Sequence, residues 1–312
     1  MKVLAIVVRY KTAWEDSQTI QSLSGEFCRC PDLKNHISVL IWDNSPAPLD
    51  SPQLSFPAEY RASEGNLGVS GAYNRGMERA KSMDCPWLLL LDQDTTLPPG
   101  YLQRMLDYSR EMQARGPVAS VVPILMDGNQ VLSPGVLRKL RTKPISASSH
   151  GLQDDLVIPF NSGALIRVQD LSEIGGFNED FWLDYSDYVV YDRLQSRGKK
   201  IYVAGDLVIQ HKLSILDFDS NVSPQRYANF LYAEGSYWDQ YRPAAFGYLH
   251  TLRLLVRGVR QFVRFRTKVF SFMTLSYCLK RIYLSRRRRL EEWKKVSDKR
   301  SLPSVRHGKV VD

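Results

Sequence analysis

The chain has 312 residues, of which 44% are hydrophobic, and a formal net charge of +9. This length accommodates one large α/β core or two smaller ones, and no segment approaches the ~20 consecutive apolar residues that a membrane-spanning helix needs. Four cysteines are too few for a disulfide framework of this size, which favours a reducing compartment.

The positive charge is concentrated near the C-terminus. Residues 251–300 contain sixteen Lys and Arg and three acidic residues, so this window carries +13 and the remainder −4. A pI near 9.3 raises nucleic-acid binding as a function. Because the charge lies behind a mildly acidic body and no nucleic-acid module is recognisable, we expect no nucleic-acid partner.

Strand-like and helix-like segments alternate along the first two-thirds of the chain. The N-terminal apolar run is interrupted by Arg9, so it predicts a first buried strand and not a signal peptide. Apolar runs predict strands at residues 3–8, 37–42, 87–91, 118–125 and 158–166, and helices at 14–27, 70–82, from Pro98 on and at 185–197. This alternation predicts an α/β fold with a mostly parallel central sheet flanked by helices.

The remaining segments are less regular. Residues 126–157 are rich in Ser, Pro and charge, and we expect them to form an irregular loop or flap. Short strands are expected at residues 200–203 and 207–210, and from about Pro224 the pattern is helical, aromatic and increasingly basic.

Two carboxylates, Asp92 and Asp94, follow the four leucines of the strand at residues 87–91. At positions i and i+2 of extended chain they project to the same side, where their repulsion raises the cost of ionising both. A hard divalent cation removes that cost, and Mg²⁺ typically binds one or two carboxylates together with phosphate oxygens of a substrate. The strand end of an open α/β sheet is also where ligands usually bind. For an isolated Asp-x-Asp, a solvated turn is the alternative.

Two further motifs carry polar residues at helix starts. Asn66-x-Gly68 and Asn74-x-Gly76 combine Asn with Gly, which lets a backbone approach a ligand, although a glycine-containing loop with a capping residue is the alternative. Asp184 and Asp187 are three residues apart and share a helix face. Helix capping is a competing explanation for one of these carboxylates.

In this order, the motifs resemble the family 2 glycosyltransferases, inverting enzymes of the GT-A fold, over about residues 3–213. Within that family the sequence is most similar to bacterial rhamnosyltransferases of polysaccharide biosynthesis. The similarity lies in Val8-Arg9-Tyr10, Asp43-Asn44-Ser45, Asn66 to Gly76, Leu91-Asp92-Gln93-Asp94, and Gly175 to Asp187. The chain departs from the rhamnosyltransferase pattern at Val189, Val190 and Lys11, where an acidic residue, Trp and Asn are usual.

The resemblance implies a role for each motif residue on the donor side. Mg²⁺ or Mn²⁺ would be held by Asp94, with Asp92 contacting the metal through water or the ribose, and with His211 near the metal and diphosphate. The other substrate-binding residues that it implies are Tyr10, Asp43, Asn66, Gly68, Asn74 and, on the acceptor side, Ser162.

For catalysis, the resemblance implies that Asp187 is the general base. Asp184 would bind or orient the acceptor. Arg193 could either bind the diphosphate or anchor the base by an ion pair, and His211 could equally be structural.

The implied activity is transfer of L-rhamnose from dTDP-L-rhamnose to a hydroxyl of a growing bacterial cell-surface glycan, O-antigen or another polysaccharide. A UDP-sugar donor and a catalytically silent GT-A membrane scaffold are the alternatives. The implied domains are a GT-A catalytic domain at 1–215 and a basic helical region at 216–312. Within the first domain, residues 1–97 would bind the nucleotide sugar and residues 98–215 the acceptor.

The basic region has its own pattern. Arg253, Arg257, Arg260 and Arg264 recur every three or four residues, so they lie along one helix face with apolar residues on others. This pattern suits a helix in the interface of an anionic membrane, where a lipid-linked acceptor would be found. The expected location is therefore cytoplasmic, peripheral on the inner face of the cytoplasmic membrane. The alternative is a helical subdomain packed on the body with a solvated basic face.

Overall fold

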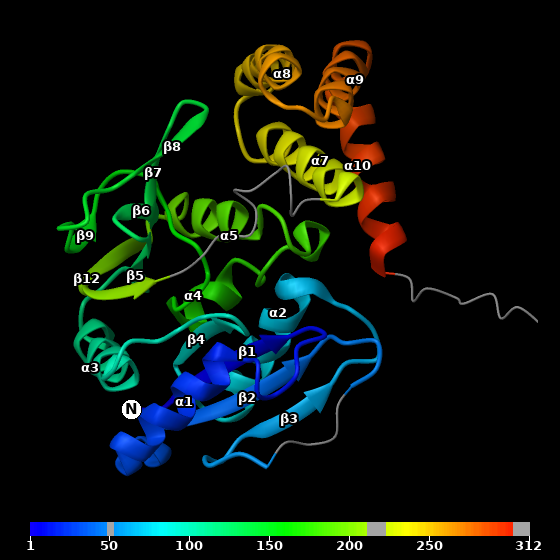
Figure 1. The fold of residues 1–312 in the computed structure, drawn as a ribbon. Helices are drawn as coiled ribbons and strands as arrows, with labels where there is room; N and C mark the ends of the chain where they lie inside the picture. The colour runs from blue at the N-terminus through cyan, green and yellow to red at the C-terminus, as the bar shows by residue number, and fades with distance from the viewer. Residues whose placement is uncertain (49–52, 211–222, 302–312) are drawn as a thin grey trace, which may run out of the picture.

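The computed structural model describes residues 1–48, 53–210 and 223–301, with side chains to residue 298. A mixed sheet forms its centre, with strand order β3-β2-β1-β4-β11-β5-β12-β9 (Figure 1). Its main strands are β1 (Val3–Arg9), β2 (Ile37–Asp43), β3 (Glu59–Ala62), β4 (Trp87–Asp92), β5 (Val118–Asp127), β11 (Leu165–Arg167) and β12 (Lys200–Gln210). Neighbours pair in parallel except at β11, which is antiparallel to β4 and β5, and at the edge strand β9. The predicted α/β fold with a mostly parallel sheet is confirmed.

The strand register brings the candidate site residues to one edge of the sheet. Arg9 at the end of β1 pairs with Asp43 at the end of β2, and Val8 pairs with Asp92 at the end of β4. Residues 88 to 91 are fully buried, as expected for leucines of a parallel strand covered on both faces. The apolar core therefore fixes the strand ends, and the polar residues that follow them meet at one edge.

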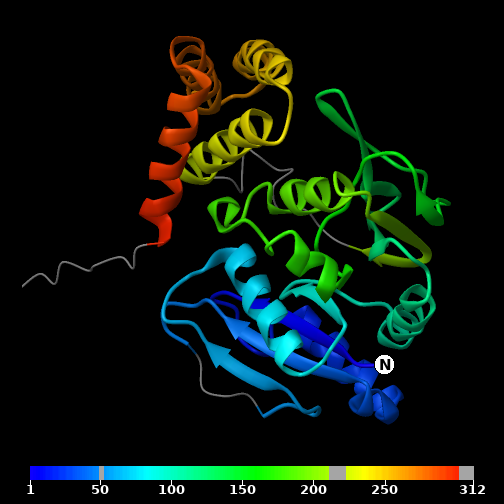
Figure 2. The same cartoon turned by 180° about the vertical axis from the view of Figure 1, so that it is seen from behind.

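Helices cover both faces of the sheet (Figure 2). On one face, α1 (Gln18–Arg29) and α3 (Tyr101–Gln113) contribute to one hydrophobic cluster with the strands. On the other, α2 (Gly68–Ser82), α4 (Val168–Glu173) and α5 (Ser186–Gln195) contribute to a second cluster. Two short 3₁₀ helices, η1 (Pro31–Asn35) and η2 (Glu179–Phe181), connect these elements.

The segment at 126–157 is more regular than expected. It forms the strands β6 (Gln130–Ser133), β7 (Gly135–Arg138), β8 (Arg141–Pro144) and β9 (Gly151–Gln153), and β7 also pairs with β10 (Val157–Ile158). The prediction of an irregular loop was wrong, because these strands are only two to four residues long and mostly incompletely buried, and therefore lack a long apolar run. The two strands expected at 200–210 are one strand, β12, with an irregular register between Ala204 and Val208.

Within the described residues 223–301, four helices follow: α7 (Pro224–Gln240), α8 (Ala244–Arg264), α9 (Val269–Tyr283) and α10 (Arg286–Ser301). They are packed on the body: Tyr237 and Trp238 of α7 and Trp293 of α10 belong to the same hydrophobic cluster as α2 and α5. The Trp293 and Phe181 rings lie 5.1 Å apart. Among the described residues, no helix combines the length and apolar character needed to cross a bilayer.

Candidate active site

Asp92 is held at the end of β4 by two hydroxyl groups. Tyr73 of α2 donates to Asp92 Oδ1 over 2.8 Å, and Ser162, in the loop before β11, donates to Asp92 Oδ2. Ser162 reaches this position because β11 runs antiparallel to β4, so the loop before β11 lies beside the end of β4. Two expected site residues, Asp92 and Ser162, are thus in direct contact.

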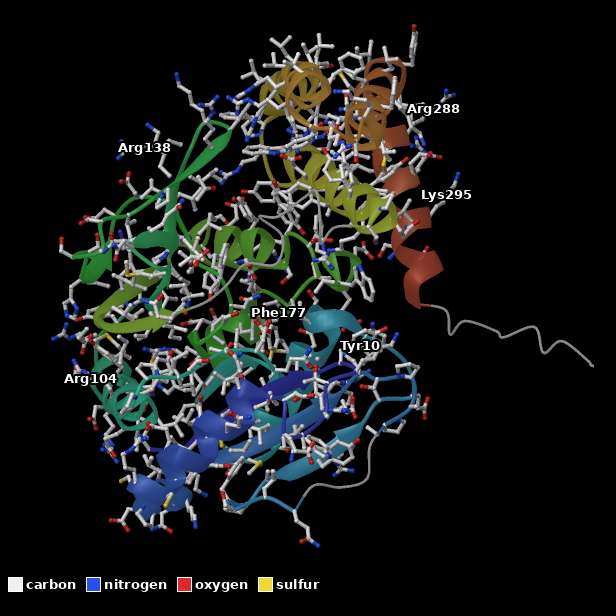
Figure 3. All side chains as sticks on the ribbon, viewed as in Figure 1. Tyr10, Arg104, Arg138, Phe177, Arg288 and Lys295 are labelled. Atoms are coloured by element: carbon white, nitrogen blue, oxygen red, sulfur yellow. The ribbon has the colours of Figure 1, made fainter. Side chains whose placement is uncertain are left out.

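Gln93 joins the ends of β1 and β4. The backbone N–H of Tyr10 donates to Gln93 Oε1 over 2.7 Å, and Gln93 Nε2 donates to the Tyr10 carbonyl over 3.3 Å. The Tyr10 side chain remains 39% exposed at this edge, above the sheet (Figure 3). Tyr10 is therefore positioned beside the Asp92–Asp94 turn by its backbone, and its ring is accessible to a ligand.

Asp94 is exposed just beyond the end of β4. Within the described part of the chain, no group of three or more His, Cys, Asp or Glu side chains could hold a metal ion by itself. Two carboxylates are nevertheless enough for Mg²⁺ or Mn²⁺ when phosphate oxygens and water complete the coordination, so Asp92 and Asp94 fit such a cation. His211, the third expected ligand, lies outside the described residues.

The Asp187 carboxyl, in the first turn of α5, lies near Asp92. Burial, and then the neighbouring Asp92 carboxylate, raise the pKa of Asp187 to about 8, although bonds from the Asn161 backbone and from Ser186 oppose this. The residue as a whole is half-buried. A carboxyl with a raised pKa beside a second carboxylate is a common setting of an acid–base residue.

Asp184 faces the helical region. It is buried, and Arg226 of α7 donates to Asp184 Oδ1 over 2.8 Å. Its neighbour Tyr185 adopts a left-handed conformation at φ 63° and precedes the first turn of α5. Asp184 thus links the α5 start to α7, a contact that agrees with an orienting role.

Asp43 is fully buried at the end of β2 and already has several partners. Arg9 makes a salt bridge to Oδ2, Tyr60 donates to Oδ2 over 2.8 Å, and the Ser45 N–H donates to Oδ1 over 2.9 Å. Burial would raise the pKa of Asp43, but the bonds from Ser45 and Tyr60 and the charge of Arg9 outweigh it and lower the pKa. In this structure Asp43 supports the strand end and is not accessible to a nucleotide.

The loop at Asn66 to Gly68 is fixed by Asn44, which follows Asp43. Asn44 Nδ2 donates to the Gly68 carbonyl over 2.9 Å, and Asn66 Oδ1 accepts from the Gly68 N–H over 2.9 Å. Gly68 has φ +67°, and a Cβ there would lie 2.2 Å from the Trp182 carbonyl oxygen. The loop therefore depends on a residue without a side chain at this position. Asn66 is partly exposed and remains available to a ligand.

Asn74 and Arg193 bond to the turn after α4. Asn74 Nδ2 donates to the Phe177 carbonyl over 3.0 Å, and its Oδ1 accepts from the Phe177 N–H over 2.8 Å. Arg193 donates to the carbonyl oxygens of Gly176, over 3.0 Å, and Ile174. Both side chains hold the Gly175-Gly176-Phe177 turn, a use that was not anticipated from the sequence.

The sequence motifs give no role to three residues of the site. Tyr73 lies within the motif from Asn66 to Gly76 but at a position with no expected role. Gln93 belongs to the motif from Leu91 to Asp94, again without an expected contact, and Arg226 lies outside every motif. Tyr73 could have been found, since Tyr73 and Met77 have the four-residue spacing of a helix face that packs on a sheet, and both are buried.

Comparisons with known proteins bear on the family and the fold of the chain. Residues 34–175 match the model of Glycosyl transferase family 2. The match covers less than half of the chain, includes Asp43, Asp92, Asp94 and Ser162, and ends before Asp184 and Asp187. The resemblance to the family is confirmed over these residues, and the closer likeness to rhamnosyltransferases stays a prediction.

Solved structures resemble the fold. The crystal structure of GalNAc-T7 with UDP, GalNAc and Mn²⁺ has a TM-score of 0.55 and 10% identity, covering 97% of this chain and 58% of that chain. TarS from S. aureus has a TM-score of 0.48 and 14% identity, covering 85% of this chain and 44% of TarS. The crystal structure of TarS 1–349 has a TM-score of 0.48 and 15% identity, covering 89% of this chain and 91% of that chain. No curated protein matches significantly. The fold is GT-A.

Proposed function

We propose that this protein is an inverting, metal-dependent glycosyltransferase that moves L-rhamnose from dTDP-L-rhamnose to a hydroxyl of a growing bacterial cell-surface glycan. The observation that carries the proposal is the placement of Asp187 beside Asp92 at the carboxyl edge of the sheet. Ser162 donates to Asp92, and its neighbour Asn161 donates to Ser186 over 3.2 Å, directly before Asp187. Asp94 lies two residues further on. The match of residues 34–175 to glycosyl transferase family 2 supports the reaction class.

On the donor side, Asp92 and Asp94 would hold Mg²⁺ or Mn²⁺, which would offset the negative charge of the departing nucleoside diphosphate. Tyr73 and Ser162 fix the orientation of the Asp92 carboxylate by donating to its two oxygens. Tyr10 and Asn66 are the accessible residues at the same edge and would contact the nucleoside. Asp43 would keep the end of β2 in place beneath them.

On the acceptor side, Asp187 would accept the proton of the attacking hydroxyl. The acceptor oxygen forms a bond to the anomeric carbon as the bond from that carbon to the diphosphate oxygen breaks, and the diphosphate leaves with the electron pair. Attack opposite the leaving group inverts the configuration. The proton ends on the Asp187 carboxylate, whose raised pKa makes it a stronger base than an ordinary Asp.

The departures from the rhamnosyltransferase pattern at Val189 and Val190 lie away from this chemistry. Both side chains are about 1% exposed and belong to the hydrophobic cluster beneath the sheet. Because Val189 and Val190 contribute to the packing of the core, these departures do not favour a silent scaffold over an enzyme.

Calorimetric titration with dTDP-L-rhamnose and with UDP-sugars, with and without Mn²⁺, tests the proposal. We expect metal-dependent binding of the dTDP sugar, and loss of this dependence in Asp94→Asn, because one of the two cation-binding carboxylates is removed. Binding of a UDP-sugar alone, as the UDP held by GalNAc-T7 suggests, would keep the reaction class and overturn the rhamnose assignment. Failure to bind any nucleotide sugar would overturn the enzyme proposal, and unchanged binding by Asp94→Asn would overturn the metal site.

A peripheral location on the inner face of the cytoplasmic membrane is part of the same proposal. Its support is the exposed apolar side chains on one stripe of α8, which include Leu252, Val259 and Val263 at 59%, 52% and 76% exposure. Such a stripe beside arginines is typical of a helix that lies in a membrane interface.

A further inference from the structure

A second cavity lies between the helical region and the β7–β8 hairpin. Its volume is about 680 Å³, and it is the space between α7 and α8 on one side and the hairpin and the start of α5 on the other. Figure 1 shows the hairpin extending beside α8, and Figure 2 shows the same from behind. Arg253 of α8 donates to the Leu140 carbonyl of the hairpin turn, which ties the two sides together. We call this space the arginine cleft.

The charge of the arginine cleft is strongly one-sided. Its only lining carboxylate among the described residues is Glu234 of α7, which makes a salt bridge to Arg257. The lining arginines are Arg141, Arg253, Arg257, Arg260 and Arg264. Arg141, Arg260 and Arg264 are exposed, and none of them makes an ion pair within the described part of the chain. The cleft therefore has several guanidinium groups available for an anion, and such groups bind phosphate oxygens in a bidentate manner.

The floor of the arginine cleft adjoins the proposed base. Tyr185 and Tyr188, which lie on either side of Asp187 in the chain, both line the cleft, and their rings are 4.6 Å apart. The hydroxyl groups of Tyr188 and Thr142 are hydrogen-bonded over 2.7 Å, so this floor is continuous with the hairpin. Because Tyr188 directly follows Asp187 in α5, the floor lies next to the helical turn that carries the proposed base, and its aromatic rings are suited to a sugar ring.

The opposite end of the arginine cleft leads to an apolar surface. Val256 lines the cleft and is itself 53% exposed. It belongs to the stripe on α8 that includes Leu252, Val259 and Val263, and Figure 3 shows side chains from α8 extending outward, away from the body. The surroundings of the cleft thus include aromatic rings at the start of α5, arginines on α8 and the hairpin, and an adjoining apolar surface on α8.

We propose that the arginine cleft binds the diphosphate of a membrane-embedded lipid acceptor, with its sugar directed over Tyr185 and Tyr188 toward Asp187 and its lipid chain leaving past Val256. The inference rests on the proposed function and names the acceptor class for the same site. Charge complementarity favours a phosphorylated occupant over a neutral glycan, and the adjoining apolar stripe favours one with a lipid chain. The cleft is separate from the Asp92–Asp94 turn, so it serves the acceptor and not the donor.

Binding of farnesyl diphosphate, a short soluble lipid diphosphate, provides the test. It is measured by calorimetry on the full chain in the presence of EDTA, which keeps the donor-side metal out of the measurement. The variant Arg260→Gln/Arg264→Gln removes two arginines of the cleft that make no ion pair with the described residues. The control Arg288→Gln/Lys295→Gln removes the same charge from the outer side of α10, where Figure 3 labels both residues. Thermal melting checks that both variants fold.

We expect farnesyl diphosphate to bind about tenfold or more weakly to the cleft variant, and within about twofold of wild type to the control. Pyrophosphate and farnesol should each bind more weakly than farnesyl diphosphate, because pyrophosphate lacks the lipid chain and farnesol lacks the diphosphate. An equal loss of affinity in the cleft variant and in the control would mean that net charge alone matters. Unchanged binding by the cleft variant, or no binding by wild type, would mean that the cleft is not the site. Each of these results overturns the inference. Pyrophosphate binding as tight as farnesyl diphosphate would overturn the lipid assignment.

The donor titration is repeated on the same variants, so that the two proposals can be separated. Metal-dependent binding of the dTDP sugar should be unchanged in the cleft variant. If wild type and the cleft variant both bind the dTDP sugar, and farnesyl diphosphate binds the cleft variant as tightly as wild type, only the acceptor inference fails. If no nucleotide sugar binds wild type, the proposed function itself fails.

Discussion

At the residue scale, the protonation state of Asp187 is central to the proposed reaction. Its raised pKa follows from burial and from the Asp92 carboxylate, so a positive charge placed between the two would favour the ionised base. The same carboxylate pair thus connects the donor and acceptor sides: binding of a cation at Asp92 and Asp94 would prepare Asp187 to accept a proton. This coupling would make the base competent mainly when the donor complex is assembled.

Replacement of Asp187 by Asn should separate catalysis from donor binding. Turnover is expected to fall about 10²-fold or more, because a general base typically contributes this much, while the affinity for the nucleotide sugar remains close to wild type. Steady-state kinetics and calorimetry on the same preparation provide the two measurements. Retained activity would place the base elsewhere, and Asp184 would be the next residue to substitute.

The raised pKa of Asp187 also predicts how stability depends on pH. The folded carboxyl keeps its proton up to about pH 8, whereas the unfolded chain releases it near pH 4. The contribution of this carboxyl to the free energy of unfolding is therefore fully favourable below about pH 4. It decreases as the pH rises and is lost once the pH has risen through about 8. Asp187→Asn removes this loss, so its stability relative to wild type should increase between pH 5 and 8.5. Each pH unit between the two pKa values changes the free energy of unfolding by about 1.4 kcal/mol, so the increase should reach roughly 4 kcal/mol at the alkaline end.

Thermal melting in EDTA without nucleotide measures that trend. Asp127→Asn, which changes an exposed carboxyl at the end of β5, is the matched control and should show no comparable increase. A difference between Asp187→Asn and wild type that stays constant across the pH range would contradict the assigned pKa.

The sequence was informative about which residues gather at the site but less informative about what each contacts. Asp92 and Ser162 are in contact, as a shared strand edge implies. Asn74 and Arg193 bond instead to backbone carbonyls and an N–H of the turn after α4. An amide or guanidinium group binds a ligand and a backbone carbonyl by the same chemistry, so the residue type alone cannot distinguish the two uses.

At the element scale, the start of α2 depends on close contact with the segment before α5. The Ser70 N–H donates to the Trp182 carbonyl over 3.2 Å, and the Ser70 hydroxyl donates to the Phe181 carbonyl over 2.6 Å. Gly68 lies against the same Trp182 carbonyl. The start of α2, which follows the Asn66–Gly68 loop, and the segment that leads to Asp184 are therefore held to each other by the bonds of Ser70.

The variant Gly68→Ala should disturb both sides of the site. A Cβ would lie 2.2 Å from the Trp182 carbonyl oxygen, at a φ of +67° that L residues rarely adopt. We expect a loss of about 2 kcal/mol or more in the free energy of unfolding, together with weaker donor binding. Gly65→Ala is the matched control, because a Cβ there meets nothing within 4 Å. Denaturant unfolding that gives the same stability for both variants would contradict the tight contact.

Long apolar elements could be predicted, and short exposed ones could not. The runs that form β1, β2 and β4 are buried on both faces, so their sequences are almost entirely apolar. In β3 and β8 the side chains are partly or fully exposed, so pairing of the backbone, and not apolar patterning, determines the strand. This is why residues 126–157 were expected to be irregular.

At the scale of the whole molecule, the helical region is part of the body and not a detachable tail. Trp238 and Trp293 are each at most 2% exposed within the cluster that also contains residues of α2 and α5. The predicted arrangement of four arginines along one face of α8 agrees with the structure, since Arg253, Arg257, Arg260 and Arg264 all line the arginine cleft. The sequence could not show that this face turns inward, because that depends on packing against the hairpin and α7.

This orientation determines which side of α8 would meet a membrane. The arginines face the cleft, while the apolar stripe faces outward and remains about half to three-quarters exposed. The alternative of a packed subdomain is therefore correct about the packing, and its basic face is solvated at Arg260 and Arg264, but the apolar stripe of α8 is exposed as well. Exposed apolar stripes of this length are unusual on a water-facing surface, and a membrane contact would explain it.

Substitution of the apolar stripe tests that contact without changing any charge. In Leu252→Asn/Val263→Asn, two side chains that are 59% and 76% exposed become polar, and affinity for anionic vesicles should fall about tenfold or more. Leu152→Asn on the edge strand β9 is the control, because Leu152 is 52% exposed but lies away from α8. Vesicle sedimentation at low and high salt separates the apolar from the electrostatic contribution, since salt weakens only the latter. Wild-type affinity in the α8 variant would mean that the exposed stripe does not enter the membrane, and the protein would then reach a lipid acceptor through charge alone.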